Sequence, residues 1–179
     1  SLLSMFPLGA WCEDGDTFVA QTPEGCSMTF TVISEAERTV CVGNEVDPAI
    51  EVETKGKITI PATVNGYQVK RIGERAFVLC NQIEEIILPT GITSIGNTAF
   101  HSCEKLQSMN IPEGVKSIGT SAFALCKELK TITIPSSVTE LGAWMLLECR
   151  SLQSVRSGIL SPSPVYIFTF TVNDPLIPE

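Results

Sequence analysis

The chain has 179 residues, a length that fits one domain or one array of repeats with small modules at its ends. Hydrophobic residues make up 44% of the chain and aromatic residues only 7%, so we expect a continuous core built mainly from aliphatic side chains. The net charge is −8 and no cluster of Lys and Arg is present, which excludes the basic patch that nucleic-acid binding needs. No apolar run is long enough to predict a transmembrane helix.

Residues 1–12 are apolar and uncharged, and the sequence turns acidic directly after them at Glu13. An apolar stretch that ends in a small-x-small site, as Ala10-Trp11-Cys12 does, is typical of the end of a secretory signal peptide. We therefore predict a signal-peptide remnant at residues 1–12, with an apolar N-terminal strand as the alternative. A signal peptide implies a protein that is secreted or displayed at the cell surface.

Residues 13–57 are predicted to form a small β cap. Residues 26–33 alternate between apolar and polar side chains, and residues 38–43 can pair with them across a turn at residues 34–37. In that hairpin Cys41 faces Phe30 rather than Cys26, although a disulfide between the two cysteines stays possible in an exported protein. A repeat array needs such a cap because the end of its core would otherwise face water.

Residues 58–157 contain a repeat with a period of 23 residues. The matching columns are Ile72, Ile95, Ile118 and Leu141, each followed by Gly; Phe77, Phe100 and Phe123; and Cys80, Cys103, Cys126 and Cys149. In one unit, residues 106–111 follow the L-x-x-L-x-L strand pattern of a leucine-rich repeat, and Pro112 ends the strand because it has no N–H. Residues 121–126 are expected to form one helical or 3₁₀ turn that carries Phe123 inward. Gly119 is expected to permit a turn conformation that other residues resist.

These columns predict a leucine-rich-repeat-type right-handed solenoid, rich in β-strands with short helical or 3₁₀ turns and preceded by the β cap. One unit cannot bury its apolar face alone, whereas stacked units can, each contacting only its neighbours. Strand stacking sets the rise at about 4.8 Å per repeat, so identical columns become ladders. Residues 158–179 depart from the repeat and are predicted to be a degenerate repeat or a partial C-terminal cap, with one more strand at residues 166–172.

The pattern I-G-x-x-A-F-x-x-C-x-x-L-x-x-I-x-[IL]-P across residues 72–155 resembles the Treponema-type leucine-rich repeats of BspA-like surface proteins. Residues 58–71 resemble the segment that begins the repeats in that family, and residues 14–43 resemble its N-terminal module. The resemblance implies a bacterial, non-enzymatic surface protein whose partners are proteins of the extracellular matrix or of a host-cell surface. It is specific for architecture and weak for function, because a repeat defines a scaffold and not a site.

No metal, cofactor or catalytic site is predicted. The four repeat cysteines are one full repeat apart, so their sulfurs would lie in a row instead of surrounding one ion, and we expect buried, reduced thiols. His101 occupies a column that holds Val78 and Ala124 in other repeats, and no nucleophile is placed beside it by the sequence. Residues 14–16 lack the following ligand pattern of a calcium loop and are predicted to be an acidic turn.

The outward positions of the predicted strands form a flat polar face with one apolar position. The candidate binding residues lie in three columns: Gln82, Lys105, Glu128 and Ser151; Glu85, Ser108, Thr131 and Ser154; and Ile87, Asn110, Thr133 and Arg156. Solenoids use extended sheets of this kind for recognition, so the leading hypothesis is adhesion or protein–protein recognition through this face. The alternatives are a structural spacer in a larger surface assembly, or a carbohydrate-binding module, for which this face lacks an aromatic groove.

Overall fold

The structure is a computed structural model that describes residues 13–158, and these residues form thirteen β-strands. The predicted signal-peptide remnant at residues 1–12 and the predicted C-terminal strand at residues 166–172 therefore lie outside the described residues. The strands are β1 (Thr17–Gln21), β2 (Ser27–Ser34), β3 (Thr39–Val42), β4 (Gly56–Thr59), β5 (Thr63–Val64), β6 (Tyr67–Ile72), β7 (Ile83–Ile87), β8 (Ser94–Ile95), β9 (Ser108–Asn110), β10 (Ser117–Ile118), β11 (Thr131–Ile134), β12 (Glu140–Leu141) and β13 (Ser154–Ser157).

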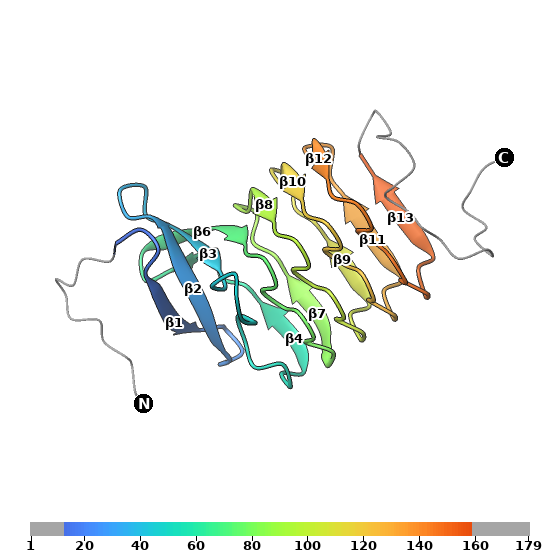
Figure 1. Ribbon diagram of the computed structural model, residues 1–179, viewed down its shortest axis with the longest axis horizontal. Helices are drawn as coiled ribbons and strands as arrows, with labels where there is room; N and C mark the ends of the chain where they lie inside the picture. Colours follow the sequence, from blue (N-terminus) through green and yellow to red (C-terminus); the bar gives the residue numbers. More distant parts are fainter. Residues whose placement is uncertain (1–12, 159–179) are drawn as a thin grey trace.

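The strands belong to two sheets, and each repeat contributes one strand to each of them. One sheet has the order β13-β11-β9-β7-β4, and all of its neighbours are parallel. The other runs β12-β10-β8-β6-β3-β2-β1, with parallel pairing from β12 to β3, antiparallel pairing from β3 to β1, and β5 beside β6. Figure 1 shows the repeats following one another along the long axis of the molecule. The expected β-rich repeat array is confirmed, and the strands of its repeats pair in parallel.

The core lies between the two sheets and is organised in ladders. Phe77, Phe100 and Phe123 are fully buried, and their rings stack face to face. The ring centroids of Phe77 and Phe100 are 5.2 Å apart, and those of Phe100 and Phe123 are 5.1 Å apart. This step is close to the strand spacing of about 4.8 Å, which confirms the predicted register of one strand spacing per repeat.

The segment after each repeat glycine is a turn without helix, so the expected helical or 3₁₀ turn is wrong for the described residues. Ser121 and Leu125 show why, since their φ angles are 53° and 61°, whereas a helix needs an unbroken run of right-handed residues. The same two positions have positive φ in every repeat: Arg75 and Leu79, Thr98 and Ser102, Ser121 and Leu125, Trp144 and Glu148.

These positive φ angles direct the backbone hydrogen bonds of the turns from one repeat to the next. The N–H of Phe77 donates to the carbonyl of Ala99 at 2.7 Å, and the N–H of Phe100 donates to Ala122 at 2.8 Å. In a helical turn these N–H groups would instead donate to carbonyls of the same turn. The turns therefore form a third ladder beside the two sheets.

The repeat glycines are required by close packing. Gly119 does not have a left-handed φ, so the expectation that it permits a special turn conformation is wrong. A Cβ atom on Gly119 would lie 2.5 Å from the backbone N of Asn97 and 2.6 Å from the carbonyl carbon of Gly96. Neighbouring repeats therefore approach each other so closely at this column that only glycine fits.

The N-terminal strands form the expected hairpin, but with a register one residue away from the predicted one. Cys41 pairs with Thr31, and Phe30 pairs with Val42, because a bulge follows Val32 and displaces the turn. Cys26 and Cys41 are both free cysteines. The strand β3 then pairs in parallel with β6, which joins this hairpin to the repeats.

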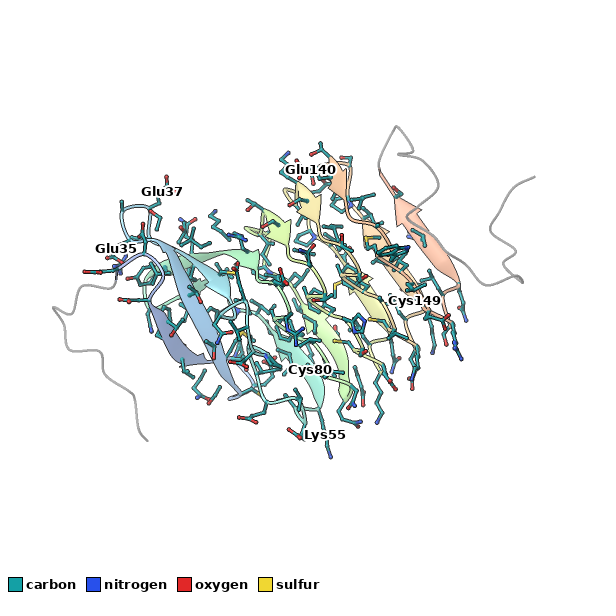
Figure 2. All side chains as sticks on the ribbon, in the orientation of Figure 1. Glu35, Glu37, Lys55, Cys80, Glu140 and Cys149 are labelled. Atoms are coloured by element: carbon teal, nitrogen blue, oxygen red, sulfur yellow. The ribbon has the colours of Figure 1, made fainter. Side chains whose placement is uncertain are left out.

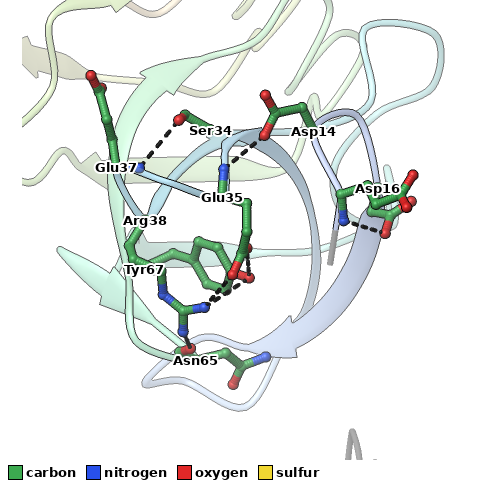
Figure 3. A network of polar contacts seen from close by, with 9 residues as sticks. Asp14, Asp16, Ser34, Glu35, Glu37, Arg38, Asn65 and Tyr67 are labelled. Atoms are coloured by element: carbon green, nitrogen blue, oxygen red, sulfur yellow. Dashed lines mark hydrogen bonds and ion pairs between the residues drawn. The ribbon is translucent and has the colours of Figure 1, made fainter. Parts of the chain in front are cut away.

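A polar network links the β2–β3 turn to β6 (Figure 3). The Arg38 guanidinium donates to the Glu35 carboxylate at 2.8 Å and lies 4.0 Å above the centre of the Tyr67 ring. The Tyr67 hydroxyl also donates to Glu35, and this bond, with a smaller effect from Arg38, lowers the pKa of that carboxyl. A cation above an aromatic ring and an adjacent carboxylate hold the turn against the strand.

Candidate functional site

The second and third predicted columns lie on the sheet formed by β4, β7, β9, β11 and β13. The first column lies instead in the turns that precede β7, β9, β11 and β13: Gln82, Lys105, Glu128 and Ser151. Glu85, Ser108, Thr131 and Ser154 are consecutive partners in the strand register, so the structure brings the second predicted column together. The third column is continuous through Asn110, Thr133 and Arg156, and Ile87 occupies the same position on β7. Most of these side chains are exposed, while Thr133 and Ser154 are half-buried. The alternation of buried and exposed residues along each strand positions them, since successive side chains point to opposite faces.

Charged groups on and beside this face are paired across repeats. The Lys105 ammonium in the first predicted column donates to the Gln82 side-chain oxygen at 2.8 Å. Lys57 and Glu85 form an ion pair of 3.7 Å between β4 and β7. Exposed pairs of this kind contribute little stability, about 0–1 kcal/mol, so their effect is mainly to leave the face close to neutral.

A shallow groove crosses the opposite sheet, and the sequence reasoning did not predict it. Its floor is formed by the strands β8, β10 and β12 and by Gly96, Gly119 and Gly142. The side chains of Asn97 and Thr120 stand along it, and the Asn97 amide oxygen accepts the backbone N–H of Thr120 at 2.9 Å. The column of repeat glycines was the signal that could have indicated the groove, because glycine leaves backbone uncovered.

The cysteine column is buried as predicted, and Figure 2 labels its first and last members, Cys80 and Cys149. The column also has a role that the spacing did not indicate. Three of the four thiols donate to the carbonyl of the phenylalanine in the preceding repeat: Cys103 to Phe77 at 3.2 Å, Cys126 to Phe100 at 3.2 Å, and Cys149 to Phe123 at 3.1 Å. The Cys80 thiol instead lies 3.9 Å from the carbonyl oxygen of Val78. Burial raises the pKa of Cys80 to about 12 and holds those of Cys103 and Cys126 well above the ordinary value. A thiol in such a setting is a weak donor and a poor nucleophile.

The residues considered above for catalysis or calcium binding make hydrogen bonds with neighbouring residues. The His101 ring nitrogen Nδ1 lies 3.0 Å from the hydroxyl of Ser102, and the ring is half-buried. The Asp14 carboxylate accepts the backbone N–H of Glu35, and the Asp16 carboxylate accepts that of Glu13, so both aspartates cap turns. Within residues 13–158, no group of three or more His, Cys, Asp or Glu side chains is placed to hold a metal ion. No helix in this part of the chain is long and apolar enough to cross a membrane.

Trp144 is an exposed aromatic residue that the sequence analysis did not single out. Its side chain is 51% exposed, and it follows β12 at a turn position occupied by Arg75, Thr98 and Ser121 in the other repeats. A tryptophan in a column of otherwise small or charged residues was the sequence signal that could have identified it.

Comparison with known proteins identifies the architecture. The sequence model of the BspA type Leucine rich repeat region matches six copies over residues 55–163, which is more than half of the chain. A search of curated protein sequences finds no match.

Solved structures agree with this match. A leucine-rich repeat protein from Bacteroides capillosus is 29% identical with a TM-score of 0.58, over 78% of this chain and 97% of that one. The T. pallidum leucine-rich repeat protein TpLRR is 22% identical with a TM-score of 0.56, over 77% of this chain and 67% of that one.

The pneumococcal vaccine antigen PcpA is 22% identical with a TM-score of 0.50, over 82% of this chain and 51% of that one. The matched region is thus about half of PcpA. The likeness to these structures shows the leucine-rich-repeat fold, and together with the repeat model it establishes that the chain belongs to the BspA type leucine-rich repeat family.

Proposed function

We propose that this chain is a non-enzymatic binding module of a secreted or cell-surface protein and that it recognises a protein partner through the strand face. The strand face is defined as the outward side chains of β7, β9, β11 and β13 in the second and third predicted columns, together with the first column in the turns that precede these strands. The observation that carries the proposal is the strand register, which aligns Glu85, Ser108, Thr131 and Ser154 in one row on an exposed parallel sheet. Extended sheets of repeat proteins are common recognition surfaces.

The proposal includes the architecture that presents this face. The stacked repeats form a right-handed solenoid over residues 58–157, because parallel crossover connections are almost always right-handed. Residues 13–57 cap its N-terminal end. Support for the cap comes from the backbone N–H of Ala49, which donates to the carbonyl of Ala76 at 2.6 Å and so continues the ladder of turns beyond the first repeat.

Family membership supports the surface location and the class of partner. Leucine-rich repeat domains generally mediate protein interactions, and one structural relative is a vaccine antigen by name. We therefore propose export of this chain and a partner among proteins of the extracellular matrix or of a host-cell surface. The buried, protonated thiols and the occupied histidine support the absence of catalysis.

A pair of charge-balanced variants tests the strand face. Ser108→Lys with Thr131→Glu would extend the row of Lys57 and Glu85 with alternating charges, so the sheet should stay folded while the face changes. The matched control is Ser94→Glu with Ser117→Lys on the opposite sheet, where these two serines are register partners.

Binding to immobilised matrix proteins should fall about tenfold or more for the strand-face variant and stay unchanged for the control. Retained binding by a folded strand-face variant would move the site elsewhere. If the unmodified chain captures none of the immobilised proteins, the spacer function takes precedence over the binding function.

A further inference from the structure

Trp144 has an exposed ring that packing of the core does not explain. Its ring is half exposed, whereas the other aromatic side chains between residues 13 and 158 are buried: Phe18, Phe30, Tyr67, Phe77, Phe100 and Phe123. Its φ of 55° lies in the left-handed region, which is unfavourable for a bulky side chain. The ring therefore does not fill the core, and its bulk is unfavourable at this backbone conformation. The same left-handed φ recurs at Arg75, Thr98 and Ser121, so the repeat turn sets the backbone, and the exposed ring is the feature that remains to be explained.

Trp144 ends a column of residues that line one edge of the molecule. The column consists of Arg75, Thr98, Ser121 and Trp144, all with positive φ and each one repeat apart, and we call it the Trp144 column. The backbone N–H groups of Thr98 and Ser121 donate to the next repeat, so the column is held in register. The hydroxyl groups of both residues make no hydrogen bond within the described part of the chain. Each of these two repeats therefore offers one unused hydroxyl in line with the exposed ring.

The spacing of the column fits a linear sugar polymer. The repeats advance by one ring stack of 5.1 to 5.2 Å, as the core phenylalanines show. This step is close to the length of one pyranose unit in an extended β-linked glycan chain. A glycan that runs along the column would therefore place one sugar on Trp144 and the next two over Ser121 and Thr98. A pyranose presents C–H groups on its face, which pack on an aromatic ring, and hydroxyls at its rim, which pair with Ser and Thr.

The surroundings of Trp144 favour a neutral glycan over a protein. Tryptophan is common in protein hot spots, but hot spots lie in well-packed regions that exclude water. Ser and Thr, which precede Trp144 in this column as Ser121 and Thr98, are under-represented among them. The other large apolar side chains that are exposed in the described residues are distant: Leu79 lies three repeats away in a turn, Ile87 lies on the strand face, and Val19 and Val46 lie before the repeats. Two arginine side chains of these repeats also have partners within the chain. Arg150 pairs with Glu148 at 2.7 Å, and Arg75 donates to the carbonyl of Val46.

We propose that the Trp144 column binds an extended, neutral, β-linked glycan, with the Trp144 ring as the stacking platform. This site is separate from the strand face, so either proposal can fail without the other.

The test uses the full chain carrying Trp11→Phe, in which Trp144 is the remaining one of two tryptophans and reports its own surroundings by fluorescence. Cellohexaose and maltohexaose have the same sugars and differ in linkage, so only the extended β-linked chain matches the column. Cellohexaose should change the Trp144 emission saturably, and maltohexaose should not.

The variant Trp144→Asn removes the ring and places a residue that tolerates a left-handed φ. Its Tm should be equal to or above that of the parent, while cellohexaose binding measured by calorimetry weakens about tenfold or more. The matched control Leu79→Asn also replaces an exposed apolar side chain at a left-handed position, with φ 64°, and should bind normally. Trp144→Phe should keep part of the affinity, because a smaller ring still stacks.

Several outcomes would overturn the proposal. These are no saturable response to cellohexaose, an equal response to maltohexaose, unchanged binding by Trp144→Asn, or an equal loss with Leu79→Asn. A marked fall in the Tm of Trp144→Asn would show that the ring has a structural role instead. Binding of Trp144 to an immobilised matrix protein without any sugar response would identify it as a protein-binding residue.

Discussion

Replacing Gly119 with alanine should damage the array far more than the addition of one methyl group suggests. The new Cβ would lie 2.5 Å from the backbone N of Asn97 and 2.6 Å from the carbonyl carbon of Gly96. Both contacts are with backbone, so no flexible side chain can move aside, and two neighbouring repeats must separate locally. Overpacking costs about 1–3 kcal/mol and occasionally more, and we expect about 3 kcal/mol here because the obstacle is rigid.

Alanine substitutions at two other glycines distinguish the effect of crowding from the effect of backbone strain. At Gly91 the nearest atom to an added Cβ is the carbonyl oxygen of Val69 at 3.7 Å, and its φ is not left-handed. Gly91→Ala should therefore be neutral or stabilise the protein by about 0.4–1 kcal/mol, since alanine restricts the unfolded chain. Gly114 has room but a φ of +102°, so Gly114→Ala should cost about 1–3 kcal/mol through strain alone.

The assay is equilibrium unfolding in urea followed by circular dichroism, together with thermal melts. A loss of about 3 kcal/mol corresponds to a fall in Tm of roughly 6–12 °C for a domain of this size. If Gly119→Ala is as mild as Gly91→Ala, the repeats do not approach each other as closely as described, and the explanation of the glycine column fails.

Three further predictions follow from burial and titration. Leu129→Ala empties a fully buried position and should cost about 2–5 kcal/mol, whereas Thr133→Ala on the strand face should stay within about 0.5 kcal/mol; equal losses in urea unfolding would contradict the assignment of inside and outside. Burial raises the pKa of Cys80 from 9.0 to about 12, so the stabilising effect of the protonated thiol is complete below pH 9 and should be lost as pH rises toward 12; Cys80→Ala should flatten this loss in unfolding experiments. Hydrogen bonds from Thr59 lower the pKa of Glu24 from 4.5 to about 2, so its contribution is present above pH 4.5 and should disappear as pH falls toward 2; a Glu24→Gln variant with the same acid profile would refute this.

The repeat period made the core and the strand face predictable from the sequence. A period of 23 residues fixes which side chains align, so the stacking of Phe77 on Phe100 and the row through Ser108 and Thr131 follow once the strands are located. Alternation within each strand then separates Met109, which is buried, from its exposed neighbours.

Other features depend on contacts that spacing does not specify. A helical turn and a turn with two left-handed residues need the same number of residues, so the conformation of Ser121 and Leu125 could not be predicted from the period. The close approach at Gly119 depends on the distance between neighbouring backbones. The register of Cys41 opposite Thr31 depends on a bulge, and bulges have no reliable sequence pattern here. The sequence shows that Trp144 differs from the other residues of its column, but it does not show that the ring is exposed.

The ladder of turns has a consequence for how this chain can change in length. Each turn receives its backbone partners from the adjacent unit, as Phe77 does from Ala99 and Phe100 from Ala122. Duplication or loss of one whole unit would leave the columns of the remaining repeats aligned. A deletion of a single residue would shift the aromatic stack, the thiol donors, the glycine contacts and both sheets out of alignment at once. Such an array can evolve, or be engineered, in steps of complete units much more readily than by small insertions and deletions.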